Sequence, residues 1–170
     1  MQPFSREFNA AVHVMADKVC PCGYDLAPNA PTNLADLVDW IERTGRIAVV
    51  PDNSDETIFG DASEKDFNYD FRAWHDWTHY HIRADFNLIG ETRVAMQQIA
   101  DLAKIYGTAF ADKYKPLILA EVIGQALHNE LLGCFPKHQR LFDNNFLAPF
   151  NLEYGYGGTF DYVRHPSTNN

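Results

Sequence analysis

The stretch LILAEVIGQALHNELLGC, residues 117–134, is apolar on most sides when it is drawn as a helix. A helix that is apolar all round is typical of the centre of a helical fold, where other elements cover each of its faces. Pro116 precedes the stretch and suits the first position of a helix, because the N–H that proline lacks has no intrahelical partner there. The stretch therefore predicts a mostly α protein built around a central helix that begins at Pro116.

Helical patterns continue on both sides of this stretch. The further helices that we expect cover residues 4–19, 34–44 with Thr32 or Asn33 as cap and Gly45 as stop, 68–83, 90–107, and a short segment that opens at Pro136. RIAVV (46–50) and ETIFG (56–60) are short β-type runs on either side of a Pro-Asp-Asn turn, which predicts that they pair as two strands. The expected fold is a compact helical bundle with a small two-stranded β ribbon.

The chain has 170 residues and shows no internal repeat and no linker, so we expect a single globular domain over residues 1–170. Residues 68–134 would form the helical core that carries the functional site. Residues 146–170 are rich in Tyr, Phe and Gly and would form an irregular covering tail.

The charge balance argues against a nucleic-acid or membrane partner. The chain carries 14 Lys and Arg against 23 Asp and Glu, a net charge of −9, which disfavours contact with a phosphate backbone. No apolar stretch reaches the ~20 residues that span a bilayer, and the charged N-terminus does not resemble a signal peptide. Cys20, Cys22 and Cys134 are an odd, sparse set, typical of reduced thiols. We therefore expect a cytoplasmic protein that acts on a small molecule.

The stretch FRAWHDWTHYH, residues 71–81, holds three of the seven histidines of the chain. His75 and His79 are four residues apart, so on a helix their rings lie on one face, separated by a rise of ~6 Å, and can bind one metal ion. Glu91 follows a glycine at the start of the next helix, and Glu121 lies inside the apolar central helix, where a carboxylate is costly unless it is paired or coordinating. These patterns predict a metal site with the ligands His75, His79, Glu91 and Glu121.

Three further side chains are candidates for catalysis at this site. Asp76 would accept a proton from a metal-bound water or orient an imidazole. Gln125 and His128 extend the face of Glu121 by one and two turns, where they would face the substrate or support the ligands.

Alternative interpretations remain open for several of these residues. The two histidines would serve as hydrogen-bonded packing, and Glu121 would form a structural ion pair with Arg72 or Arg93. A second zinc site is another hypothesis, against the alternative of ordinary reduced thiols. Its ligands would be Cys20, Cys22, Cys134 and His138.

Three motifs in chain order resemble those of a group of small, largely uncharacterised proteins of phage and related mobile genomes. They are Phe71-Arg72 with His75-Asp76, then Gly90-Glu91, then Glu121 with Gly124-Gln125. The resemblance covers about residues 69–128. It implies a shared helical site and no particular reaction.

HDWTH also resembles the H-D-x-x-H run of HD-type metallophosphohydrolases, which implies metal-dependent hydrolysis. This chain departs from that family because only the distant His13 lies upstream, and because Asp101 and Asp112 are no clear match to the downstream aspartate. The helical carboxylates are similar to those of ferritin-like di-iron bundles, whose Glu-x-x-His motif has Gly124 here in place of histidine.

Taken together, the residues predict a metal-dependent enzyme with a His/His/Glu/Glu site between helices. The first expectation is a hydrolase that uses a metal-bound water on a phosphorylated or amide-bearing small molecule, with Zn or Mn as cofactor. Two alternatives remain: a non-haem iron oxygenase or oxidase with the same ligands, and a non-enzymatic module that binds a protein partner. The number of metal ions and the oligomeric state stay open.

Overall fold

The computed structural model describes residues 3–51, 56–61 and 65–148. The described ranges are predominantly helical, which confirms the expected fold class. The helices are α1 (Arg6–Val19), α2 (Leu34–Thr44), α3 (Lys65–Ile82), α4 (Leu88–Tyr106), α5 (Thr108–Ile118), the π-helical turn η1 (Leu119–Gly124), α6 (Gln125–Leu132) and α7 (Gln139–Leu147). None of the helices in these ranges is both long and apolar enough to cross a membrane. Most of the expected covering tail, residues 149–170, lies outside the described residues.

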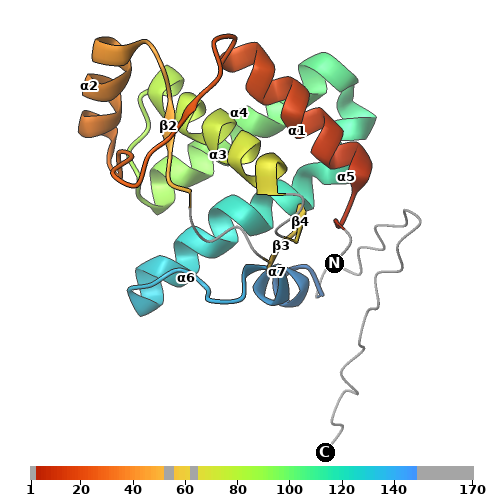
Figure 1. Ribbon diagram of the computed structural model, residues 1–170. Helices are drawn as coiled ribbons and strands as arrows, with labels where there is room; N and C mark the ends of the chain where they lie inside the picture. The colour runs from red at the N-terminus through yellow and green to blue at the C-terminus, as the bar shows by residue number, and fades with distance from the viewer. Residues whose placement is uncertain (1–2, 52–55, 62–64, 149–170) are drawn as a thin grey trace, which may run out of the picture.

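The helix α3 runs through the middle of the molecule (Figure 1) and packs against α1 and α4. The helix α4 in turn packs against α5 and η1, and α7 lies across η1 beside the β3 strand. Trp74 of α3 is completely buried, as are Leu102 of α4 and Leu117 of α5. These helices therefore share one apolar core. The helices α3 and α4 also face each other through inner residues that are not part of this core.

The local signals for α2 act as expected. Asn33 caps the helix, because its Oδ1 accepts a hydrogen bond of 2.9 Å from the Asp36 backbone N–H. Gly45 ends the helix with a φ of 72°, in the left-handed region that glycine adopts without strain.

The strands form, but with partners other than those expected. β2 (Ala48–Val49) pairs in parallel with β1 (Asp25–Leu26), and not with the ETIFG run. ETIFG instead folds back on itself, with β3 (Glu56–Thr57) antiparallel to β4 (Gly60–Asp61). The prediction of one ribbon between 46–50 and 56–60 was wrong.

Packing of α2 explains this pairing. Leu37 and Ile41 of α2 lie in one apolar cluster with Ile47 and Val49. This contact makes α2 the crossover between two parallel strands, and parallel strands need such a crossover. A non-local contact therefore determined the partner of β2, and the short-range turn signal did not.

The central helix is also longer than predicted, and its geometry changes along its length. It begins at Thr108, and Pro116 lies inside α5 and not at its start. After α5 the chain continues as the π-helical turn η1, in which the Gln125 N–H bonds to the Ala120 carbonyl, five residues back. Such a turn takes one more residue than an α-helical turn. Side chains from Leu119 onward therefore do not point in the directions that a 3.6-residue repeat predicts.

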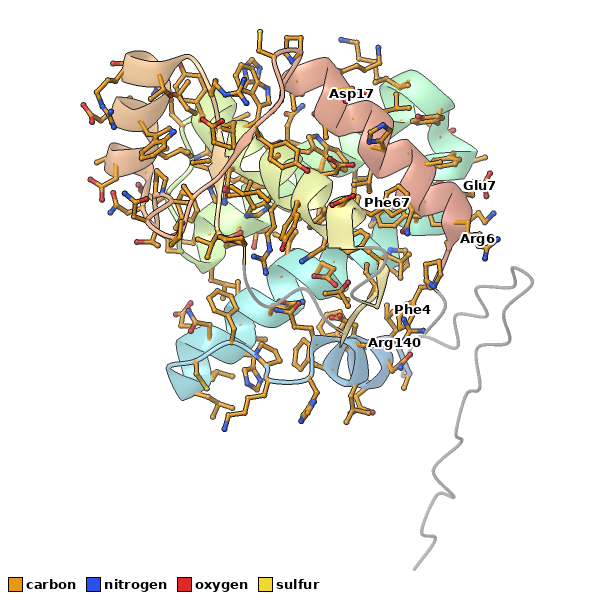
Figure 2. All side chains as sticks on the ribbon, viewed as in Figure 1. Phe4, Arg6, Glu7, Asp17, Phe67 and Arg140 are labelled. Carbon is orange, nitrogen blue, oxygen red and sulfur yellow. The ribbon has the colours of Figure 1, made fainter. Side chains whose placement is uncertain are left out.

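The last helix, α7, begins at Gln139, three residues after the predicted start at Pro136. Figure 2 labels Arg140 of α7 beside Phe4, and the guanidinium lies 4.4 Å from the centre of that ring. Arg140 also donates a hydrogen bond of 3.1 Å to the Thr57 backbone oxygen. Through these two contacts, the start of α7 packs against the N-terminal segment and against β3.

Candidate metal site

His75 and His79 lie on the inner face of α3, and their imidazoles point to one place. The two Nε2 atoms are 3.0 Å apart, with the rings edge to face at a centroid distance of 4.6 Å. The spacing of four residues on a helix produces this approach, as the sequence predicted.

The end of α3 determines how the His79 ring is held. Arg83 adopts a left-handed φ of 51°, and the Ala84 N–H then bonds back to the His79 carbonyl oxygen at 3.1 Å. This turn also places the Ala84 carbonyl 2.9 Å from His79 Nδ1. A carbonyl can only accept, so Nδ1 carries the proton and Nε2 keeps its lone pair free for an ion.

The start of α4 delivers the carboxylate. Asn87 caps the helix by accepting a 3.0 Å hydrogen bond from the Gly90 N–H. Gly90 lies directly against the preceding loop, since a Cβ atom there would be 1.7 Å from the Asp85 carbonyl oxygen. Only glycine permits this approach, and it brings the next side chain, Glu91, onto the two histidines.

Each oxygen of Glu91 faces one histidine. Oε2 lies 3.2 Å from His75 Nε2, and Oε1 lies 3.3 Å from His79 Nε2. The site is largely closed to solvent: the His79 side chain is 0% exposed, His75 16% and Glu91 13%. Phe86 stacks on the His79 ring with a centroid distance of 4.0 Å and covers one side.

The electrostatics of the site follow from this closeness. Burial by itself would raise the pKa of Glu91, but the charges and hydrogen bonds of His75 and His79 outweigh it and lower that pKa to about 2. Burial likewise opposes a charge on His75, yet Glu91 outweighs it and raises the pKa of that imidazole. The carboxylate is therefore ionised over the whole physiological range, as a metal ligand must be.

Among the described residues, this is the one place where three His, Cys, Asp or Glu side chains bring ligand atoms within 4.8 Å of one another. Three of the four predicted ligands, His75, His79 and Glu91, thus converge. The set of two imidazoles and one carboxylate is a common one for Zn²⁺ and for Fe²⁺.

The fourth predicted ligand, Glu121, does not belong to this group. Its Oε2 accepts a 2.8 Å hydrogen bond from Gln125 Nε2, and within the described residues its Oε1 has no hydrogen-bond partner. The π-helical geometry of η1 accounts for the error, because the prediction assumed regular α-helical facing along this segment. Burial raises the pKa of the Glu121 carboxyl group to about 7, and the positive charge of Arg72, one of its proposed structural partners, opposes this rise.

The three candidate catalytic residues separate in the structure. Asp76 lies in α3 next to His75, and burial raises the pKa of its carboxyl group to about 6 while both site histidines act on it through their charge. Gln125 is occupied by Glu121, and the His128 ring contacts Phe142 edge-on at 5.2 Å. The roles predicted for Gln125 and His128 required Glu121 to be a metal ligand. Because it is not one of the grouped residues, only Asp76 remains a candidate for catalysis at this site.

The residues of the hypothetical second zinc site do not form a ligand group in the described part of the chain. Cys20 is buried, whereas Cys22 and Cys134 are exposed, and all three are free thiols. Burial raises the pKa of the Cys20 thiol to about 12, so it stays protonated.

Sequence reasoning overlooked Gln98. This side chain is completely buried in α4, two helical turns after Glu91, and among the described residues neither its Nε2 and Oε1 atoms nor Nδ1 of His75 has a hydrogen-bond partner. Its spacing of seven residues from Glu91 puts both on one face of the helix, which is a signal that the sequence did contain.

The fold and site together define a helical protein with a buried group of two histidines and one glutamate. Comparison with family models, curated proteins and solved structures finds no match to this chain. The three resemblances of its motifs therefore stay predictions.

Proposed function

We propose that this protein binds one divalent transition-metal ion through His75, His79 and Glu91 and is a metal-dependent hydrolase of a small molecule. The observation that carries the proposal is the convergence of both Nε2 atoms and the Glu91 carboxylate at separations of 3.0 to 3.3 Å in a closed site. Bonds of about 2.1 Å would separate two ligand atoms by about 3.0 Å at a right angle and by about 3.4 Å at a tetrahedral angle. The observed separations fit this range.

The surroundings of the ligands also favour a metal. The Ala84 carbonyl holds the tautomer of His79 that leaves Nε2 free, and such a backbone acceptor behind the ring is usual for metal-binding histidines. Without an ion, Nε2 of His75 would carry a proton and donate it to Glu91 or to Nε2 of His79, and a bound cation would take the place of that proton. The arrangement is better explained by a cation between them.

Asp76 is the residue that we assign to proton transfer. An ion bound by the three ligands would lower the pKa of a coordinated water and supply a nucleophile at neutral pH. Asp76 follows His75 in α3, and the charges of both site histidines act on its carboxyl group, so we assign to it the role of accepting and returning this proton. Asp76→Asn should therefore abolish turnover while the protein retains its metal.

Metal content is the first test. The full chain is purified, reconstituted without oxygen with Fe(II), Mn(II) or Zn(II), and measured by elemental analysis. We expect about one ion per chain in the wild type and in His81→Ala, an exposed histidine of the same helix that stacks on Trp77. His75→Ala and Glu91→Gln should lose the ion. A wild type that binds none of the three metals would leave the non-enzymatic binding module as the function.

A second candidate is a non-haem iron oxygenase or oxidase. It is favoured by the ligand set itself, since two histidines and one carboxylate leave open positions for oxygen on Fe(II). The two reactions are separated by loading the protein with Zn(II) or Mn(II) and assaying p-nitrophenyl phosphate and a p-nitroanilide, and by loading it with Fe(II) and following oxygen uptake. Hydrolysis that Asp76→Asn abolishes would support the hydrolase, and iron-dependent oxygen uptake without hydrolysis would replace it by the oxygenase.

A further inference from the structure

The hairpin formed by α6 and the start of α7 concentrates exposed apolar side chains. Five large apolar residues in this short segment are between 40% and 71% exposed: Leu127, Leu131, Leu132, Phe135 and Leu141. Single exposed leucines are normal on a protein surface, whereas a contiguous group of this size marks a contact with another molecule. We refer to these five residues as the hairpin patch.

Four of the five side chains follow α6 to its end and beyond it. Leu127 and Leu131 are four residues apart, so they share one face of the helix, turned away from the buried Gln125. Leu132 is the last residue of α6, and Phe135 follows in the loop. The patch therefore runs along α6 and around its C-terminal end.

The start of α7 adds the fifth side chain. The rings of His128 in α6 and Phe142 in α7 meet edge to face at a centroid distance of 5.2 Å, so the two helices adjoin at this point. Leu141 precedes Phe142 and is 59% exposed. Figure 1 shows α6 at the edge of the molecule, where it packs against η1 and α4. The outer face of the hairpin is thus uncovered within the part of the chain that the structure describes.

The area of the patch matches what a dimer interface needs. The exposed fractions of its residues together equal about three fully exposed side chains, which at roughly 150–200 Å² each give about 500 Å² of apolar surface per copy. A standard interface buries about 800 Å² on each partner, of which somewhat more than half, about 450 Å², is non-polar. The patch of one copy, facing the same patch of another, is therefore large enough to hold a stable dimer.

The charges beside the patch are balanced. Glu130 and Lys137 are both exposed, and neither forms an ion pair with another residue of the described ranges. In a contact of two-fold symmetry, a pairing of Glu130 in one copy with Lys137 in the other occurs twice. The net charge of −9 opposes association of two chains through their acidic surfaces. The hairpin is thus a place where two copies can meet without like-charge repulsion.

We propose that the hairpin patch is the contact between two copies of this chain, which pack α6 against α6 about a two-fold axis. Leu127 and Leu131 of one copy then pack on the same residues of the other, and the loop with Phe135 closes over the end of the partner helix. The inference goes beyond the proposed function and does not depend on the metal site.

Sedimentation velocity of the full chain over a range of micromolar concentrations tests the dimer. The wild type should be a dimer that dissociates on dilution. Leu131→Glu should be monomeric throughout, because it would bury a carboxylate from each copy at the contact. Phe135→Ser is a second variant, in the loop, in case the first folds poorly, and should weaken the dimer by about tenfold or more.

Ile89→Glu is the matched control for these variants. Ile89 is 76% exposed in α4, outside the patch, so this variant should remain a dimer. A dimer that persists in Leu131→Glu would overturn the proposal. A monomeric wild type would also overturn it and would leave residues 149–170 or a different protein as the occupant of the patch.

Cys134 identifies the face that the dimer uses. It is exposed in the loop between Leu132 and Phe135, Cys22 is the other exposed thiol, and Cys20 is buried. A short bismaleimide should therefore link two copies of Cys22→Ser through Cys134 and should not link copies that also carry Leu131→Glu. Cys134→Ser, which keeps Cys22, should give no linked dimers. A dimer that cannot be linked through Cys134 would use another face, and the proposal would be wrong.

Discussion

His79 Nδ1 and the Ala84 backbone oxygen lie 2.9 Å apart, and this contact links the end of a helix to the state of a metal ligand. The helix α3 ends in a turn at Arg83, and after this turn the chain leads into α4. The same turn places a carbonyl behind the His79 ring and so leaves Nε2 as the unprotonated atom. Backbone geometry thereby prepares the site before any ion binds.

Metal binding should stabilise the folded protein. An ion that binds only the folded state adds about 2.7 kcal/mol to the free energy of unfolding when its free concentration is about 100 times Kd. We expect thermal denaturation of the metal-loaded wild type to shift to lower temperature when a chelator is added. Glu91→Gln should show no such shift, and His81→Ala should show the full one. A chelator effect of the same size in Glu91→Gln would mean that the ion binds elsewhere.

Gln98 should support the metal through His75. Its amide is completely buried and, like Nδ1 of His75, has no hydrogen-bond partner among the described residues, so we expect it to orient this imidazole when the ion binds. Gln98→Leu should weaken metal binding by about 10- to 100-fold, measured by competition with a chromogenic chelator. Gln97→Leu is the matched control, because Gln97 is bonded to Asp101. Equal affinities in the two variants would remove Gln98 from the site.

Gly90 should be required for the position of Glu91. A Cβ atom at Gly90 meets backbone atoms of Asp85, which cannot move aside as a side chain can. Gly90→Ala should therefore lower the free energy of unfolding by about 3 kcal/mol, in the range of overpacked sites, and should also weaken metal binding.

Gly45→Ala provides the comparison for this variant. Gly45 has a φ of 72° and open space where a Cβ atom would stand, so alanine there costs only the strain of about 1 kcal/mol. Chemical denaturation would give both values. If the two variants lose the same stability, the close approach at Gly90 is not what matters.

The contact between His13 and Asp70 should make stability pH-dependent. His13 Nδ1 lies 2.8 Å from Asp70 Oδ2, and this hydrogen bond raises the pKa of the imidazole. The stabilising contribution is complete below the unfolded pKa of about 6.5 and is lost as the pH rises through the folded value. His13→Gln should therefore cost more stability at mildly acidic pH than at mildly alkaline pH.

The size of this effect is small because the His13 side chain is 55% exposed. We expect a difference of about 0.5 kcal/mol between the two conditions, as for partly solvated ion pairs. Urea denaturation of the wild type and the variant at each pH measures it. A cost of His13→Gln that is independent of pH would show that the imidazole contributes by packing alone.

Much of the helical architecture was predictable because its signals are local. The cap at Asn33 and the stop at Gly45 act within one turn of the chain, so they work in any tertiary context. The pairing of β2 with β1 was not predictable in this way, since it depends on α2 packing between them.

The sequence by itself determined that this protein is helical and that His75 and His79 share one helix face, because helical hydrogen bonds and side-chain spacing are properties of neighbouring residues. It predicted both Glu91 and Glu121 as ligands of one site. The tertiary structure brings only Glu91 to the two histidines. The contact of Gly90 with the Asp85 backbone brings Glu91 to the imidazoles, while Glu121, in the π-helical turn, accepts a hydrogen bond from Gln125 and lies outside the group.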